Sequence, residues 1–186
     1  MTKLFQYAGI AAGVVLIAFG IGAAVIGLNG RDRVATELAR EQIVGTPDST
    51  IPNQLVNSGS EAQAFAAVIR KHTLEATGGK TYAQMPQYIT ASGKGTSDKA
   101  AAGKDPKTGA PTSNPARQIW ITETALTTAL NTAYFAESMA TFVMAMGFAL
   151  LLTGIGFLVL SLKVLRQPAT TEKHTRPAAK VAVGAA

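Results

Sequence analysis

Residues 7–28 have the sequence YAGIAAGVVLIAFGIGAAVIGL, and residues 138–162 have the sequence SMATFVMAMGFALLLTGIGFLVLSL. Neither stretch contains an Asp, Glu, Lys, Arg or His. A helix needs about 20 mostly apolar residues, at roughly 1.5 Å each, to cross the hydrocarbon core of a bilayer. Both stretches meet this requirement, so the sequence predicts an integral membrane protein with two transmembrane helices.

The N-terminal stretch also has the basic lead of a secretory signal, since Lys3 lies within the short segment of residues 1–6. A signal core usually has about 7–15 apolar residues and is closed by a small-x-small cleavage site. The stretch here is longer, and no clear site of this kind closes it. We therefore expect an uncleaved anchor, with cleavage within residues 22–30 as the alternative.

Basic residues are concentrated after the second stretch. Of the formal net charge of +6, residues 163–186 carry five Lys or Arg against one acid. Such a tail favours the cytoplasmic side, where it would also contact anionic lipid headgroups. Arg31, Arg33 and Arg40 argue for the opposite orientation, although charges count less in a loop longer than about 60 residues. We predict a two-pass protein of the cell membrane with both termini cytoplasmic and residues 29–137 as an extracytoplasmic domain.

Composition excludes several kinds of site. The chain has no cysteine, so it forms no disulfide, thiolate metal site or thiol nucleophile. Ion and proton pathways usually depend on charged residues within the membrane, and the two stretches have none. Nucleic-acid readers group basic residues with aromatics on one folded face, a pattern that is missing here. We therefore expect no nucleic acid, metal or cofactor as a partner.

Small residues recur along the first stretch at the four-residue spacing that allows two helix backbones to approach closely. The predicted packing residues are Gly9, Gly13, Gly20, Ala24, Gly27 and, in the second stretch, Gly147 with Ala145. Two interpretations remain open. The two spans pack on each other, or the small-residue face binds a second copy or another membrane subunit.

Helical periodicity continues beyond both spans, so the predicted fold is mainly α, with the extracytoplasmic domain built on extensions of the two transmembrane helices. After a weak point at Asn29 and Gly30, Val34 and Leu38 recur four residues apart. Apolar residues also repeat from about residue 116 onward, which predicts a stalk about 30 Å long before the second span. Glu137, at the outer edge of that span, is expected to be solvated.

In the middle region, the helix with the clearest start and stop signals covers residues 61–77. Ser60 with Gln63 gives a capping box at its start, Gly78 and Gly79 end it, and Thr81 with Gln84 repeats the capping pattern. Residues 42–44 and 54–56 are weak strand candidates. Residues 92–115, like residues 167–186, contain few large apolar side chains, so we expect both to be flexible.

Residues 64–83, AFAAVIRKHTLEATGGKTYA, resemble a segment of small two-span membrane proteins of actinobacteria, a family of unknown function. The order of features over residues 5–162 is also similar to that family, with residues 92–115 as a longer insertion. Its members are often labelled as the small subunit of an aromatic ring-opening dioxygenase. Such enzymes usually hold iron through two His and a carboxylate. The chain has only His72 and His174, which the predicted topology places on opposite sides of the membrane, so we reject that activity.

The function expected from these features is a non-catalytic accessory or scaffolding component of an envelope or membrane complex. Its partners would be the lipid bilayer and other membrane subunits or a second copy. An extracytoplasmic ligand-binding or sensor module is the alternative, with the ligand unidentified, and an enzyme using Glu123 or the outer-domain residues is the third class. The candidate interaction residues of the outer domain are Lys71, His72, Glu75 and Tyr82. For His72 we favour a structural role over acid–base chemistry.

Overall fold

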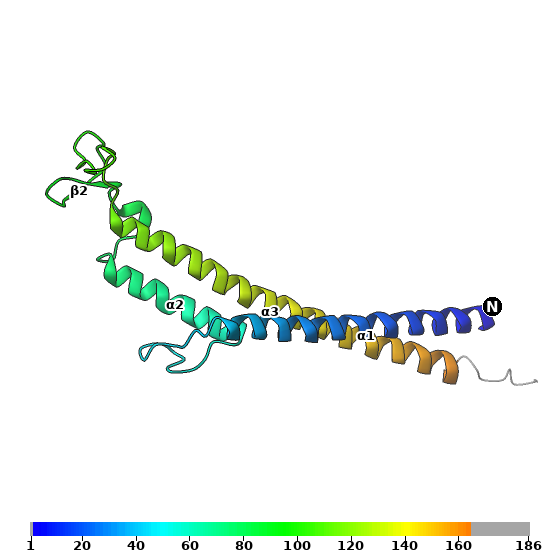
Figure 1. Cartoon of the computed structure of the whole chain (residues 1–186). Helices are drawn as coiled ribbons and strands as arrows, with labels where there is room; N and C mark the ends of the chain where they lie inside the picture. The colour runs from blue at the N-terminus through cyan, green and yellow to red at the C-terminus, as the bar shows by residue number, and fades with distance from the viewer. Residues whose placement is uncertain (1, 165–186) are drawn as a thin grey trace, which may run out of the picture.

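The structure, a computed structural model, describes residues 2–164 and is elongated and mainly helical (Figure 1). Helices α1 (Thr2–Arg40) and α3 (Pro115–Val159) lie antiparallel along each other, and a π-helical turn, η2 (Leu160–Val164), continues α3. Helix α2 (Gly59–Ala76) packs on the part of α3 that extends past the end of α1. Both α1 and α3 are long and apolar enough to cross a membrane.

The paired apolar parts of α1 and α3, residues 2–30 and 138–164, form what we call the stem. Glycines keep its two backbones in contact. A Cβ atom added to Gly20 would lie 2.7 Å from the carbonyl oxygen of Gly147, and one added to Gly13 would lie 2.9 Å from that of Gly154. The contact residues repeat every seven positions on each helix, a spacing that keeps one face toward the partner helix. Of the seven predicted packing residues, all except Ala145 lie on these facing surfaces.

Two expectations for the stem were wrong. Ala145 is exposed and takes no part in the helix contact, because it lies two positions from Gly147 and residues two apart point to different sides of a helix. Gly154 makes the contact instead. The predicted weak point at Asn29 and Gly30 is also missing, since α1 runs through it without interruption. There Gly30 is packed against Ala140 of α3, which supports the helix.

Residues 31–137 form what we call the head, in which α2 is closed at both ends by its own sequence. The cap is Ser58 rather than the predicted Ser60. Its hydroxyl accepts the N–H of Glu61, whose carboxylate accepts the N–H of Ser58 at 3.0 Å. The helix therefore starts at Gly59, two residues before the expected position. At its other end the N–H of Gly79 donates to the carbonyl of Leu74 at 2.7 Å, the Schellman arrangement that positive-φ glycines favour.

The loop between α1 and α2 folds back on itself. Val44 and Leu55 form an isolated antiparallel bridge, and the N–H of Val56 donates to the carbonyl of Ile43 at 2.8 Å. The two predicted strand candidates thus pair with each other, although only as a single bridge. This loop places Val56 in the buried core of the head. That core consists of Leu38, Val56, Ala62, Ala66 and Leu130.

The end of the head farthest from the stem contains a 3₁₀ turn, η1 (Tyr82–Gln84), and two short antiparallel strands, β1 (Tyr88–Ile89) and β2 (Gly95–Thr96). Residues 92–115, expected to be flexible, are held by local polar turns. For example, the carboxylate of Asp105 accepts the N–H groups of Lys107 and Thr108, each at 2.8 Å. Composition predicted correctly that this segment buries little apolar surface, and its mobility stays a prediction.

Candidate functional site

The four candidate interaction residues do not form one site. Lys71 and His72 lie on α2 and both contact Asp48 of the preceding loop, with Nζ and Nε2 at 2.7 and 2.9 Å from the same carboxylate oxygen. Glu75 is exposed one turn further along α2. Tyr82 lies at the far end of the head, where the guanidinium of Arg117 is 3.9 Å from the centre of its ring.

Asp48 was missed by the sequence analysis. Its only local signal is a turn, in which the hydroxyl of Thr46 donates to the Asp48 carboxylate at 2.8 Å. The hydrogen bond from Lys71, and then that from His72, holds the pKa of Asp48 well below its usual range, and the same carboxylate raises the pKa of Lys71. All three groups are exposed. Their geometry fastens the loop to α2, which is a structural task.

Asp48→Asn is expected to loosen this loop, and acid should do the same to the native chain. Because the pKa of Asp48 is lowered by folding, its contribution is present above the ordinary Asp range near about 4 and is lost as the pH falls toward the lowered value. Amide hydrogen exchange of residues 45–56, corrected for its intrinsic pH dependence, would speed up in both cases. Asp105→Asn, at the far end of the head, should leave that exchange unchanged. Equal rates in the Asp48 variant and the native chain would contradict the proposed role.

A second polar cluster joins the end of α2 to α3. The Trp120 side chain is only 4% exposed, and its Nε1 donates to the carbonyl of Lys80 at 2.9 Å and the hydroxyl of Thr77 at 3.3 Å. The guanidinium of Arg70 lies 5.3 Å from the Trp120 ring and 3.8 Å from a carboxylate oxygen of Glu123. Glu123, one of the residues that the enzyme hypothesis offered as a reactive group, is thus a buried ion-pair partner between two helices.

Glu137 is not solvated as expected. Its side chain is 19% exposed and accepts the backbone N–H of Gly59, the first residue of α2, while Arg31 of α1 approaches it at 3.4 Å. A carboxylate at the start of a helix stabilises the unpaired N–H groups there. Sequence alone did not show this role because the three groups belong to three different helices. Glu137 therefore connects all three helices where the stem meets the head.

Glu137→Ala is expected to weaken the docking of the start of α2. The side chain supplies a charged hydrogen bond, a type of contact that contributes roughly 1.5–3 kcal/mol. A loss of about 2 kcal/mol corresponds to roughly 30-fold faster local opening, which hydrogen exchange of residues 59–63 would measure. Glu75→Ala, an exposed carboxylate on the same helix, is the matched control. If both variants exchange alike, Glu137 does not hold α2.

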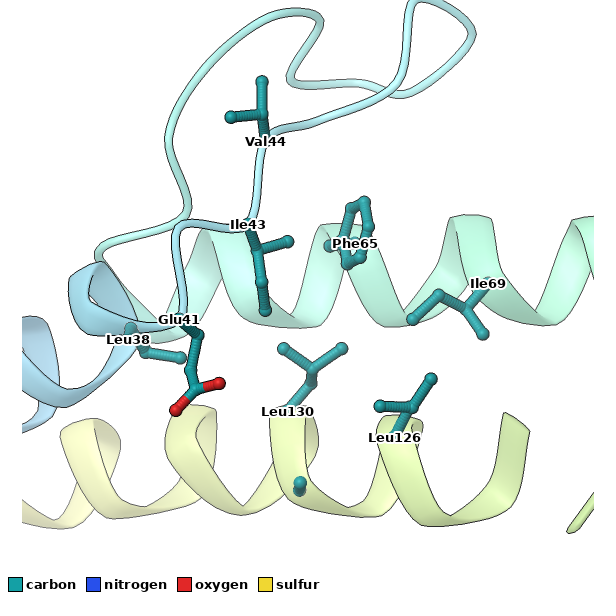
Figure 2. A pocket seen from close by; sticks show the side chains of 9 residues that line it. Leu38, Glu41, Ile43, Val44, Phe65, Ile69, Leu126 and Leu130 are labelled. Carbon is teal, nitrogen blue, oxygen red and sulfur yellow. The ribbon is translucent and has the colours of Figure 1, made fainter. Parts of the chain in front are cut away.

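The head also contains an apolar groove made of two adjoining pockets of about 500 Å³ each, which share Leu38 and Glu41. Figure 2 shows the pocket farther from the stem, where side chains of α2, α3 and the loop face a common space. Its lining includes Phe65, Ile69 and Leu126. The pocket nearer the stem lies between α1 and α3. We call these two pockets together the apolar groove.

Residues 2–164 contain no group of three or more His, Cys, Asp and Glu that could hold a metal ion. His174 lies outside the described residues, so its predicted separation from His72 stays a prediction. Neither a protein-family model, nor a curated protein, nor a solved structure matches the chain.

Proposed function

We propose that this chain is a two-pass integral membrane protein that acts without catalysis, as an accessory or scaffolding component of an envelope or membrane complex. The observation that supports the membrane location is that the two long helices contain uncharged segments of similar length. Helix α1 has no charged residue between Lys3 and Arg31, and α3 has none between Glu137 and Lys163. The intervening residues span about 40 Å at roughly 1.5 Å each, which matches a bilayer with its headgroup regions.

The two charge-free lengths also coincide in space. Arg31 and Glu137 contact each other at one end of the stem, and the antiparallel pairing brings Lys3 and Lys163 to the other end. Between these ends large apolar side chains point outward, for example Phe19 at 69% and Leu152 at 68% exposed. Two paired helices cannot cover such side chains by themselves. A surrounding bilayer supplies the missing apolar contact.

The scaffolding role is supported by how the head uses its charged groups. The side chains of Asp48, Glu123 and Glu137, together with their basic partners, join one helix or loop to another. Polar networks of this kind give a fixed shape rather than a reactive centre. Raised on two stem helices, the head would present that shape to partners at the membrane surface. The apolar groove supports the second candidate, a ligand-binding module on the same anchor.

Orientation can be tested with single cysteines, because the chain has none of its own. With the head outside the cytoplasm, Ser97→Cys in the exposed far end of the head should react with a membrane-impermeant maleimide on intact cells. Ala186→Cys should react only after permeabilisation. The reverse pattern would place the head in the cytoplasm, and labelling of both sites on intact cells would contradict a two-pass topology.

The scaffolding role is tested by purifying the tagged full-length protein from its native membrane in mild detergent and weighing the intact complexes. Stoichiometric additional subunits are the expected result, and their identity would name the process. A chain that emerges alone, or only as copies of itself, would overturn the accessory role and favour the ligand-binding alternative. Glu137→Ala serves as a companion variant, since a partner that recognises the assembled head should then dissociate more readily.

A further inference from the structure

We propose that the apolar groove holds one acyl chain of a membrane phospholipid, which rises from the bilayer into the head. This inference rests on the proposed function, because it requires that the stem crosses a membrane. It goes further by naming the chemical class of ligand and the place where it binds.

The position of the groove supports a lipid as its occupant. The lining of the pocket nearer the stem includes Gly30 of α1 and Ala136 of α3. These residues are the immediate neighbours of Arg31 and Glu137, the charged pair that ends the apolar stem. The groove therefore opens at the level where the proposed bilayer surface lies. An acyl chain can enter it from the membrane without crossing water.

The dimensions of the groove fit a single chain. From Ala136 to Leu126 it follows ten residue steps of α3, or about 15 Å at roughly 1.5 Å per residue. One acyl chain spans half of the bilayer core, which is about 30 Å thick and consists of two leaflets. Each pocket of about 500 Å³ also falls within the size range of small-molecule sites.

The lining of the groove is mostly apolar, and Val34, Phe65 and Leu126 are typical of it. One carboxylate, that of the exposed residue Glu41, borders both pockets where they adjoin. Arg33 lines the pocket nearer the stem, where its guanidinium can form hydrogen bonds with a lipid phosphate. The carboxylate of Glu37, on the same rim, is bound to Arg40 at 2.8 Å. This arrangement suits a chain that enters tail first and keeps its headgroup at the membrane surface.

The C-terminal segment, residues 165–186, follows Val164 at the end of the stem opposite the groove, about 40 Å away at 1.5 Å per helical residue. With the stem across a bilayer, that end lies on the other side of the membrane from the groove, so this segment is not the occupant. A second copy of the chain is the other candidate occupant, and the experiment below distinguishes it from a lipid. The location at the membrane boundary favours the lipid.

Photo-crosslinking in nanodiscs made of a single phospholipid, palmitoyl-oleoyl phosphatidylglycerol, tests the proposal. The photoreactive residue p-benzoylphenylalanine replaces one aromatic side chain at a time in the full-length protein: Phe65 in the groove, Phe148 in the stem, or Tyr82 at the far end of the head. After illumination the intact protein is weighed. We expect an adduct of one phospholipid at positions 65 and 148 and none at position 82.

A blocking variant shows whether the adduct at position 65 depends on the groove. Ala136→Phe places a ring in the mouth at an exposed position and should lower the yield about tenfold, the effect of ~1.4 kcal/mol of lost binding. The same change at exposed Ala125, outside the groove, should leave the yield unaltered. A lipid adduct at position 65 whose yield is unchanged by Ala136→Phe would overturn the proposal. A crosslink to a second copy of the chain, or the absence of any adduct at position 65, would overturn it as well.

The crosslinker at position 148 in the stem shows whether a negative result at position 65 concerns the groove alone or the proposed membrane-spanning function. If Phe148 is replaced and gives the lipid adduct while position 65 gives none, the chain crosses the bilayer and the groove does not bind lipid. If position 148 gives no adduct either, the membrane-spanning function itself is wrong.

Discussion

Gly20→Leu is expected to separate α1 from α3 in the stem. A Cβ atom at position 20 would lie 2.7 Å from both the carbonyl oxygen of Gly147 and the backbone nitrogen of Leu151. These are backbone atoms of a helix and cannot turn away as a side chain can. Overpacking of this kind typically costs roughly 1–3 kcal/mol, and we expect about 3 because the helices must move apart along their whole contact.

Spin labels at Leu4→Cys and Leu162→Cys would measure this separation, since both positions are exposed near the end of the stem that lies away from the head. The native chain should give a narrow distribution of distances between the labels, and the Gly20→Leu chain a broad and longer one. Gly22→Leu is the matched control, because a Cβ atom there meets nothing within 4 Å. Identical distributions for both variants would show that the glycine contacts do not hold the stem together.

The same geometry changes how association should be tested. The sequence left open whether the small-residue face packs within the chain or binds another subunit. In the structure the face is used within the chain, and a Cβ atom at Gly13 would lie 2.9 Å from the carbonyl of Gly154. A Gly13→Leu variant that loses a partner would thus report a damaged hairpin rather than a lost contact. Substitutions at Gly22 and Gly156, where added atoms meet open space, test association more directly.

The parts of the fold that the sequence predicted are those with local causes. The absence of charge over residues 7–28 and 138–162 and the periodicity around residues 61–77 depend only on neighbouring positions, and the corresponding helices are α1, α3 and α2. The cap of α2 was misplaced because two serines satisfy the same pattern. Ser58 has Glu61 three residues later and Ser60 has Gln63, and only the fold shows which serine is outside the helix.

The contacts of the candidate sites could not be predicted, because they join distant positions. Asp48 lies 23 residues before Lys71, and Glu137 lies 78 residues after Gly59. No local pattern identifies such pairs. They depend on how helices and loops pack together in space, which neighbouring positions in the sequence do not determine. The same reason explains why the apolar groove was missed, since its lining comes from α1, α2, α3 and a loop.

The second large effect is expected in the head, from Trp120→Ala. The ring is 4% exposed between α2 and α3, and removing a buried aromatic side chain costs roughly 3–5 kcal/mol. The carbonyl of Lys80 and the hydroxyl of Thr77 also lose the Nε1 donor that binds them. Hydrogen exchange over the second half of α2 should therefore accelerate by about two to four orders of magnitude.

Two further variants separate the contributions within this cluster. Trp120→Phe keeps one aromatic ring but removes the donor and part of the indole, so its cost should be roughly 1–3 kcal/mol, less than that of Trp120→Ala. Ile121→Ala changes an exposed neighbour and should cost less than about 0.5 kcal/mol. If Trp120→Ala were no more harmful than Ile121→Ala, the cluster would not hold α2 on α3. The spin-label distances in the stem should stay native in all three variants, because stem and head are held by separate contacts: glycine packing in one, and a buried tryptophan with its polar partners in the other.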